Sequence, residues 1–196
     1  MTHLLGLTGS IGMGKSTTAQ MFRDEDVPVW DADATVHKLY AAGGAAVPEF
    51  AKAIPQAVVS GAVDRTALKE CLSKDPDLIK TIEAIVHPLV AADRAEFLAK
   101  QNAALVVFDI PLLFETGADA WLDSVLVVTA PADVQKERVM ARGEMSEAMF
   151  AQILARQMPD ADKRARADHV IETLTLDATR EAVQKLIAQL TGAADA

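Results

Sequence analysis

Short apolar runs alternate with amphipathic stretches along this chain of 196 residues. The stretches between these runs carry apolar residues at helical spacing, as in a last helix expected over Ala178–Leu190. The short extended runs predict five β-strands: His3–Thr8, Val27–Trp30, Leu105–Asp109, Ser124–Thr129 and His169–Glu172. The third and fourth are continuous apolar runs, which suit fully buried parallel strands. Strands that alternate with helices predict an α/β fold, in which a five-stranded parallel sheet is flanked by helices.

A long helical segment, residues 35–104, separates the second predicted strand from the third. Only the run Ala57–Val59 is extended enough to suggest a strand there. We interpret 35–104 as a helical insertion into a core formed by 1–34, 105–135 and 167–196.

Local signals divide this insertion into helices. Gly61–Arg65 is expected to form a turn into a helix that Asp64 caps. The next helix is expected to hold Pro76 in its first turn and to break after His87, because Pro88 follows.

The stretch Gly9–Ser16, here called the phosphate loop, fits the pattern G-x-x-x-x-G-K-S/T. It stands between a strand and a helix expected over Lys15–Arg23, where glycines let backbone N–H groups surround an anion. Lys15 is expected to reach the β- and γ-phosphates of a nucleotide, and the Ser16 hydroxyl to bind Mg²⁺. The expected nucleotide contacts are Gly9, Gly12, Met13, Gly14, Lys15, Ser16 and Thr17.

Acidic residues follow two of the predicted strands, at the sheet edge where α/β proteins bind ligands. Asp31 and Asp33 come just after the second strand, and Asp109 ends the third. Phosphoryl transfer to an alcohol needs a group that orients the hydroxyl and accepts its proton, and we assign this role to Asp33. Asp31 and Asp109 are expected to hold Mg²⁺ with Ser16. The alternatives are that one aspartate of the pair only caps the following helix, and that Asp109 binds nothing.

Basic residues outnumber acidic ones between residues 136 and 166, in a chain whose net charge is −9. A nucleotide kinase has its lid in such a flap, between its last two strands. Arg138 and Arg142, one turn apart, are expected to neutralise charge on the transferred phosphoryl group. The alternative is a solvated pair of charged helices, which suits Lys163 and Arg164.

Two further features are expected to be structural. The run Pro111–Glu115 is apolar apart from its last residue and indicates core packing. His87 stands in an otherwise apolar helix, where a lone histidine is more often structural than catalytic, with a substrate contact as the functional alternative.

Composition narrows the class of protein. Apolar residues make up 51% of the chain, which is typical of a globular domain, and the net charge argues against a general nucleic-acid binder. A single cysteine cannot form an intramolecular disulfide, and we see neither a basic leader nor an apolar run of membrane-spanning length. We expect a cytoplasmic protein without membrane or nucleic-acid partners and leave its oligomeric state open.

Together these motifs resemble those of the dephospho-CoA kinase family over nearly the whole chain. Many kinases share the phosphate loop, whereas the combination of Asp-x-Asp, His-Pro and Pro-Leu-Leu-Phe-Glu is far more specific. The matching segments, in order, are Gly6–Thr17, Asp31–Asp33, Asp64-Arg65 with Leu68, His87–Leu89, Asp109–Glu115, Arg156-Gln157 and Asp168–Ile171.

The resemblance implies that ATP phosphorylates the ribose 3′-hydroxyl of dephospho-CoA, giving coenzyme A and ADP in the last step of coenzyme A biosynthesis. It implies a P-loop kinase core, an acceptor-binding region at 35–104 and a lid at 136–166, with Mg²⁺ as cofactor. It also implies that Asp33 is the base, that Arg138 and Arg142 are the lid arginines, and that the acceptor meets Asp33, Arg65 and His87.

The chain departs from the family pattern at three places. Ser10 stands where glycine is usual, and Met13 where a small residue is usual. Neither change removes a phosphate-binding amide, so we expect ATP to bind. Glu172–Leu176 replaces a segment in which the family often has an Asn and a Gly beside the adenine.

Other functions explain the sequence less well. A P-loop kinase of the shikimate, gluconate or nucleoside type shares the loop but is not expected to combine His87-Pro88 with Pro111–Glu115. A GTP-dependent switch needs N-K-x-D, but the only asparagine, Asn102, is followed by Ala103. A non-catalytic ATP-binding module has no need of the lysine, hydroxyl and carboxylate expected to act in catalysis.

Overall fold

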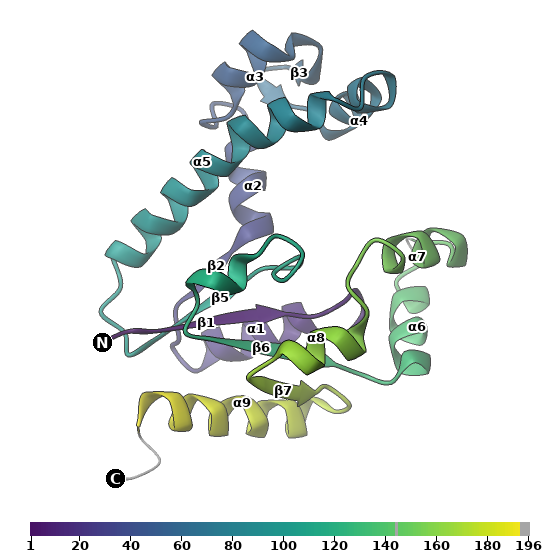
Figure 1. The fold of residues 1–196 in the computed structure, drawn as a ribbon. Helices are drawn as coiled ribbons and strands as arrows, with labels where there is room; N and C mark the ends of the chain where they lie inside the picture. Colours follow the sequence, from purple (N-terminus) through teal and green to yellow (C-terminus); the bar gives the residue numbers. More distant parts are fainter. Residues whose placement is uncertain (144, 193–196) are drawn as a thin grey trace. The chain divides into compact units, whose positions relative to one another are not determined.

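The structure is a computed structural model that describes residues 1–143 and 145–192. Residue 144, in the expected lid, and residues 193–196, at the end of the expected core, lie outside the described residues. Among the helices that are described, none combines the length and apolarity of a membrane span. The elements labelled in Figure 1 and the shorter ones between them are β1 His3–Thr8, α1 Lys15–Asp24, β2 Val29–Asp31, α2 Ala32–Tyr40, α3 Val47–Ala53, η1 Pro55–Ala57, β3 Val58–Val59, β4 Ala62–Val63, α4 Arg65–Lys74, α5 Leu78–Ala99, β5 Leu105–Asp109, η2 Ala118–Trp121, β6 Ser124–Thr129, α6 Ala132–Ala141, α7 Glu147–Leu154, α8 Asp160–Arg166, β7 His169–Glu172 and α9 Leu176–Thr191.

Five strands form one sheet, in the order β2-β5-β1-β6-β7 (Figure 1). The central strand β1 pairs in parallel with β5 on one side and with β6 on the other, and β7 pairs in parallel with β6. β5 and β6 are buried along their whole length, as expected for unbroken apolar strands that are covered on both faces. The predicted five-stranded sheet is confirmed.

The chain divides into two compact units. One consists of Met1–Trp30 and the chain from Gln101 onward, and the other of Asp31–Lys100. The first contains a hydrophobic core between the sheet and helices α1 and α9, with Leu5, Phe22 and Leu126 fully buried. The second has a separate core around Phe50. Each unit therefore has the apolar interior that an independent domain needs.

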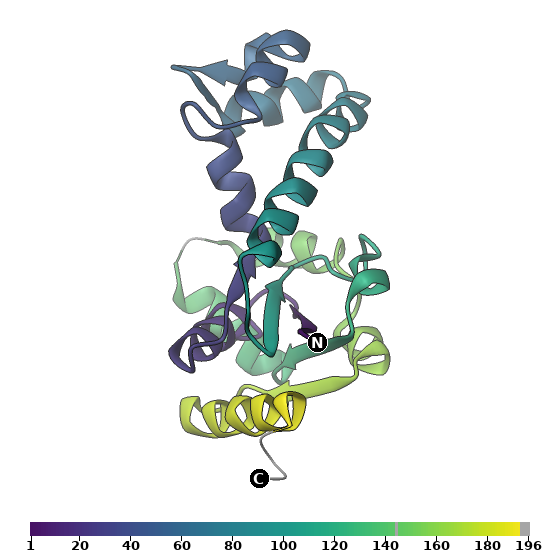
Figure 2. The same cartoon turned by 90° about the vertical axis from the view of Figure 1, so that its left-hand side faces the viewer.

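The second unit is built around α2 and α5, which contact each other and diverge toward the end of the unit that holds its shorter helices (Figure 2). It also holds a small antiparallel hairpin, in which Val58 of β3 pairs with Val63 of β4. Ser60 and Gly61 join the strands with φ of 51° and 78°, as in the two-residue turns that suit hairpins. The expected turn over Gly61–Arg65 is therefore wrong at residues 62–63, which form β4.

The helices of this unit confirm one of the three local sequence signals and contradict the other two. Asp64 caps α4 as predicted, accepting a hydrogen bond from the Ala67 N–H at 2.7 Å. The expected place of Pro76 is wrong, because α5 begins at Leu78, beyond it. The expected break at Pro88 is also wrong, because α5 continues through it to Ala99.

The physical reason for the unbroken helix lies in its packing. Ile82 and Val86 are buried six and two residues before the proline, and α5 packs against α2, α3 and α4. Pro88 itself is exposed, as is Ala84, whose carbonyl loses its backbone partner because proline has no N–H. Tertiary packing thus outweighs the local penalty of an interior proline.

Candidate active site

The phosphate loop connects β1 to α1 and depends on glycine at two left-handed positions. Gly12 has φ of 78° and Gly14 has φ of 86°. A Cβ at Gly12 would lie 2.7 Å from Val139 Cγ2, and one at Gly14 would lie 2.8 Å from Thr173 Oγ1. Both the backbone conformation and the close neighbours therefore exclude a side chain, as a loop that presents backbone amides requires.

Met13, an unusual residue for this loop, has its side chain in the hydrophobic core. The side chain is 3% exposed, and its sulfur accepts a hydrogen bond from the Ala130 N–H at 3.0 Å. The Met13 carbonyl accepts a hydrogen bond from Thr173 Oγ1 at 2.9 Å. Met13 thus anchors the loop through its side chain and leaves only its backbone for a nucleotide contact.

Lys15 and Asp109 form an ion pair beneath the loop. The aspartate ends β5 beside β1, and its side chain is 4% exposed against 16% for the lysine. A carboxylate so deeply buried requires a cation, which the lysine supplies. Ser16 and Thr17 are exposed at the start of α1, where the helix dipole favours anions. The structure thus brings Lys15, Asp109 and the loop together, as the sequence predicts.

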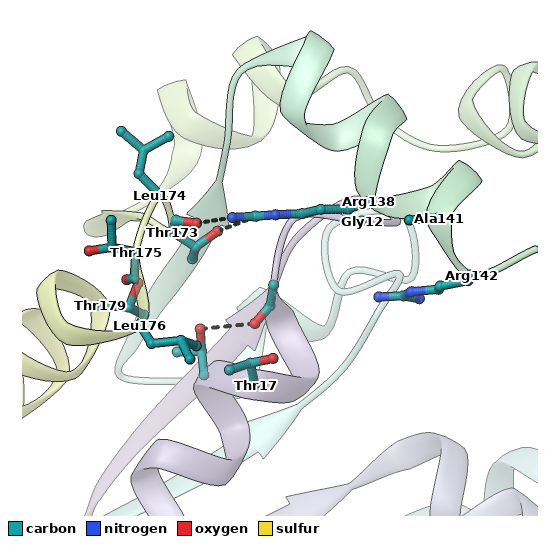
Figure 3. A pocket seen from close by; sticks show the side chains of 12 residues that line it. Gly12, Thr17, Arg138, Ala141, Arg142, Thr173, Leu174, Thr175, Leu176 and Thr179 are labelled. Carbon is teal, nitrogen blue, oxygen red and sulfur yellow. Dashed lines mark hydrogen bonds between the residues drawn. The ribbon is translucent and has the colours of Figure 1, made fainter.

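A cavity of about 360 Å³ opens beside the loop, within the first unit. Figure 3 shows Arg138 of α6 reaching across it to Thr173, with Arg142 extending into the same space. Arg138 Nη1 donates to Thr173 Oγ1 at 3.0 Å, and its Nη2 donates to the Thr173 carbonyl. Thr173, in the segment Glu172–Leu176 that departs from the family pattern, therefore holds Arg138, one of the two expected lid arginines, at the rim of the cavity.

The remaining predicted residues belong to the second unit. Asp31 caps α2 by accepting a hydrogen bond from the Ala34 N–H at 2.9 Å, so Asp31 is the member of the pair that caps the following helix. Asp33 is exposed in the first turn of the same helix, and His87 is exposed on α5. The Arg65 guanidinium lies 6.0 Å from the centre of the Tyr40 ring. Burial raises the pKa of the Tyr40 hydroxyl, against the opposing effect of this positive charge.

One ion pair near the sheet differs from expectation. The alternative of a solvated charged face is wrong for Lys163, which is fully buried, with its ammonium 3.0 Å from Glu115. Arg164 is half-exposed and pairs with Asp160 at 3.0 Å. The neighbours of Glu115 follow the expected core packing only in part, because Leu113 is fully buried whereas Leu112 is 42% exposed.

The environment of Glu115 keeps it ionised. Burial opposes its charge, but a hydrogen bond from the Met158 N–H at 2.8 Å and the Lys163 ammonium outweigh this and hold its pKa below 4.5. The signal in the sequence was an acid that ends an apolar run and therefore needs a buried partner. Nothing local identified that partner, which lies far along the chain.

Comparisons with known proteins identify relatives of this chain. The family model described as dephospho-CoA kinase matches residues 3–177. A dephospho-CoA kinase of Jannaschia sp. is 60% identical over 192 residues, covering 97% of this chain and 98% of the relative, and one of Cereibacter sphaeroides is 58% identical over 192 residues, covering 98% of each. The solved structure of dephospho-CoA kinase from Campylobacter jejuni has a TM-score of 0.70 at 27% identity, covering 98% of this chain and 99% of that one. The family expected from the motifs is confirmed: this chain belongs to the dephospho-CoA kinase family of phosphotransferases.

Proposed function

We propose that this chain transfers the γ-phosphoryl group of ATP to the ribose 3′-hydroxyl of dephospho-CoA, giving coenzyme A and ADP. The observation that carries the proposal is the phosphate loop with Lys15 seated against buried Asp109, in a member of this family. A loop of this kind binds nucleotide phosphates, and its lysine is placed to follow the charge of the group that moves.

The phosphate loop and the end of β5 supply oxygen donors that suit Mg²⁺. The Ser16 hydroxyl and the Asp109 carboxylate are hard oxygen ligands, which this ion prefers. We propose that these two residues hold it, with Asp31 contributing through the carboxylate that caps α2. When bound, Mg²⁺ neutralises charge on the β- and γ-phosphates.

The acceptor half of the proposal rests on the second unit and on the two cavity arginines. Asp33 is assigned as the base that orients the 3′-hydroxyl and accepts its proton, and its exposure leaves the carboxylate accessible to a substrate. Arg65 and His87 are assigned to bind the acceptor. Arg138 and Arg142 are assigned to offset charge on the phosphoryl group, and the 136–166 segment to act as the lid.

The test is ADP release with a panel of acceptors. We expect turnover with dephospho-CoA and none with shikimate, gluconate or nucleosides. Turnover with one of these and none with dephospho-CoA would refute the proposed substrate.

A second measurement addresses the proposed base. Asp33→Asn should leave ATP affinity nearly unchanged and lower turnover by roughly 10²- to 10⁴-fold, because the variant cannot accept the proton. Asp177→Asn is the matched control, since Asp177 is also an exposed acid in the first turn of a helix. Near-normal turnover of Asp33→Asn would remove this residue from its assigned role.

A further inference from the structure

Two glutamine side chains hold the peptide groups on either side of Ile11, in the middle of the phosphate loop. The Ile11 N–H donates to Gln157 Oε1 at 3.2 Å, and the Ile11 carbonyl accepts from Gln135 Nε2 at 2.7 Å. A backbone N–H can only donate and a carbonyl can only accept, so these contacts also fix the orientation of both side-chain amides. The loop is thus held from two sides by groups outside it.

The two glutamines come from different parts of the first unit. Gln135 lies on α6 and is 5% exposed. A Cβ at Gly12 would lie 2.9 Å from the backbone carbonyl oxygen of Gln135. This side of the loop is therefore packed directly on a helix. Gln157 lies between α7 and α8, in the segment 136–166 that is proposed as the lid.

The position of Gln157 is itself fixed by buried charge. The next residue, Met158, donates its N–H to Glu115, which pairs with the fully buried Lys163. The Lys163 ammonium also lies 3.5 Å from the Pro111 carbonyl. A chain of polar contacts therefore runs from the segment after β5, through this pair, to the peptide of Ile11.

We infer that Gln157 is a positioning residue for the nucleotide phosphates, because its bond to the Ile11 amide holds the phosphate loop in its binding shape and makes that shape depend on the 136–166 segment. Loss of the bond frees the Ile11 peptide to rotate and disorders the neighbouring amides that face an anion. The inference rests on the proposed function for the identity of the donor nucleotide, and it concerns neither the acceptor nor the proton transfer.

Gln157→Met tests this role, since methionine fills a similar space without the amide oxygen. We expect the KM for ATP and the dissociation constant for ADP to rise roughly tenfold, as the loss of one such bond predicts. The KM for dephospho-CoA and the melting temperature should stay at their wild-type values. Gln189→Met is the matched control, because Gln189 is exposed on α9, outside the 136–166 segment, and it should change none of these quantities.

Hydrogen exchange of the Ile11 amide reports the contact itself. Exchange should be faster in Gln157→Met and as slow as wild type in Gln157→Glu, which keeps an acceptor oxygen. The inference is overturned if Gln157→Met loses this protection yet keeps its affinity for ADP. It is also overturned if the variant melts at a lower temperature and turns over more slowly with an unchanged KM for ATP, which indicates a structural role only. Wild-type protein that binds ADP but does not phosphorylate dephospho-CoA would refute the proposed function and leave the ADP test of Gln157 in force.

Discussion

The ion pair between Glu115 and Lys163 predicts that removing the carboxylate destabilises the protein more than removing the ammonium. Lys163 is fully buried, whereas the side chain of Glu115 is 20% exposed. Glu115→Gln leaves a buried ammonium without its carboxylate, and breaking a buried pair in this way costs about 3–5 kcal/mol. Lys163→Met leaves a carboxylate that water still reaches and that keeps its bond from Met158, so we expect a cost of about 2 kcal/mol.

The double variant separates the energy of the Glu115–Lys163 interaction from the cost of removing each side chain. With both charges removed, no ion is left buried, so Glu115→Gln combined with Lys163→Met should cost about as much as Lys163→Met alone. The cost of the double variant would then fall short of the sum of the two single costs by about 3–5 kcal/mol, which is the cost of Glu115→Gln alone. Additive costs, or a larger cost for Lys163→Met than for Glu115→Gln, would refute the assignment of the buried charge to the lysine.

Tryptophan fluorescence during urea unfolding is a suitable assay, because both tryptophans report on the unit that contains the pair. The ring of Trp30 lies 6.0 Å from that of Phe108, and the ring of Trp121 lies 5.0 Å from it. A loss of 3 kcal/mol corresponds to a fall in melting temperature of about 6–12 °C.

The same pair predicts a pH dependence. Burial opposes the charge of Glu115, but the Met158 N–H and Lys163 outweigh it and keep the pKa of this carboxyl below 4.5 in the folded protein. A carboxyl with a lowered pKa stabilises the fold above pH 4.5, and that contribution is lost as the pH falls below it. The free energy of unfolding should therefore fall less steeply with acidification in Glu115→Gln than in the wild type. Parallel curves would contradict the lowered pKa.

Two further substitutions test the phosphate loop and a helix cap. Gly12→Ala should raise the KM for ATP more than tenfold, because the added Cβ collides with Val139 Cγ2. Gly43→Ala is the control: Gly43 has a φ of 77° but no described atom within 4 Å of an added Cβ, so this change should cost only about 1–2 kcal/mol of stability. A normal KM for ATP in Gly12→Ala would contradict the loop geometry. Asp64→Ala should lower the free energy of unfolding followed by circular dichroism by about 1 kcal/mol, because it removes the cap of α4. Asp77→Ala is its control, since Asp77 stands at the N-cap of α5 but its side chain makes no capping bond in the described structure. Equal losses of unfolding free energy in Asp64→Ala and Asp77→Ala would argue against the cap.

The features that the sequence predicted correctly depend on neighbouring residues. The places of β5 and β6 could be read directly from the sequence, because each is a nearly continuous apolar run. The phosphate loop and the Asp64 cap each depend on residue types at short, fixed spacings. Parallel pairing then brings the ends of β1 and β5 together, which is why Asp109 could be expected at the same sheet edge as the phosphate loop. The ion pair that Asp109 forms with Lys15 was not predicted.

The features that were missed depend on distant partners or on packing. Lys163 stands in a charged run, so its burial follows only from the position of Glu115 in the folded unit. Pro88 signals a helix break, but the packing of α5 overrides it. The hydrogen bonds from Arg138 to Thr173 require that α6 lies beside the end of β7, and no local sequence pattern predicts that arrangement.

The position of the transferred phosphate on the product tests the central claim most directly. Incubation of the protein with ATP, Mg²⁺ and dephospho-CoA, followed by phosphorus NMR of the product, should show a new phosphomonoester on the ribose 3′-oxygen. One coenzyme A should form for each ADP, and an acceptor that lacks the 3′-hydroxyl should give no ADP above background. ADP release without coenzyme A, or a phosphate at another position, would contradict the account.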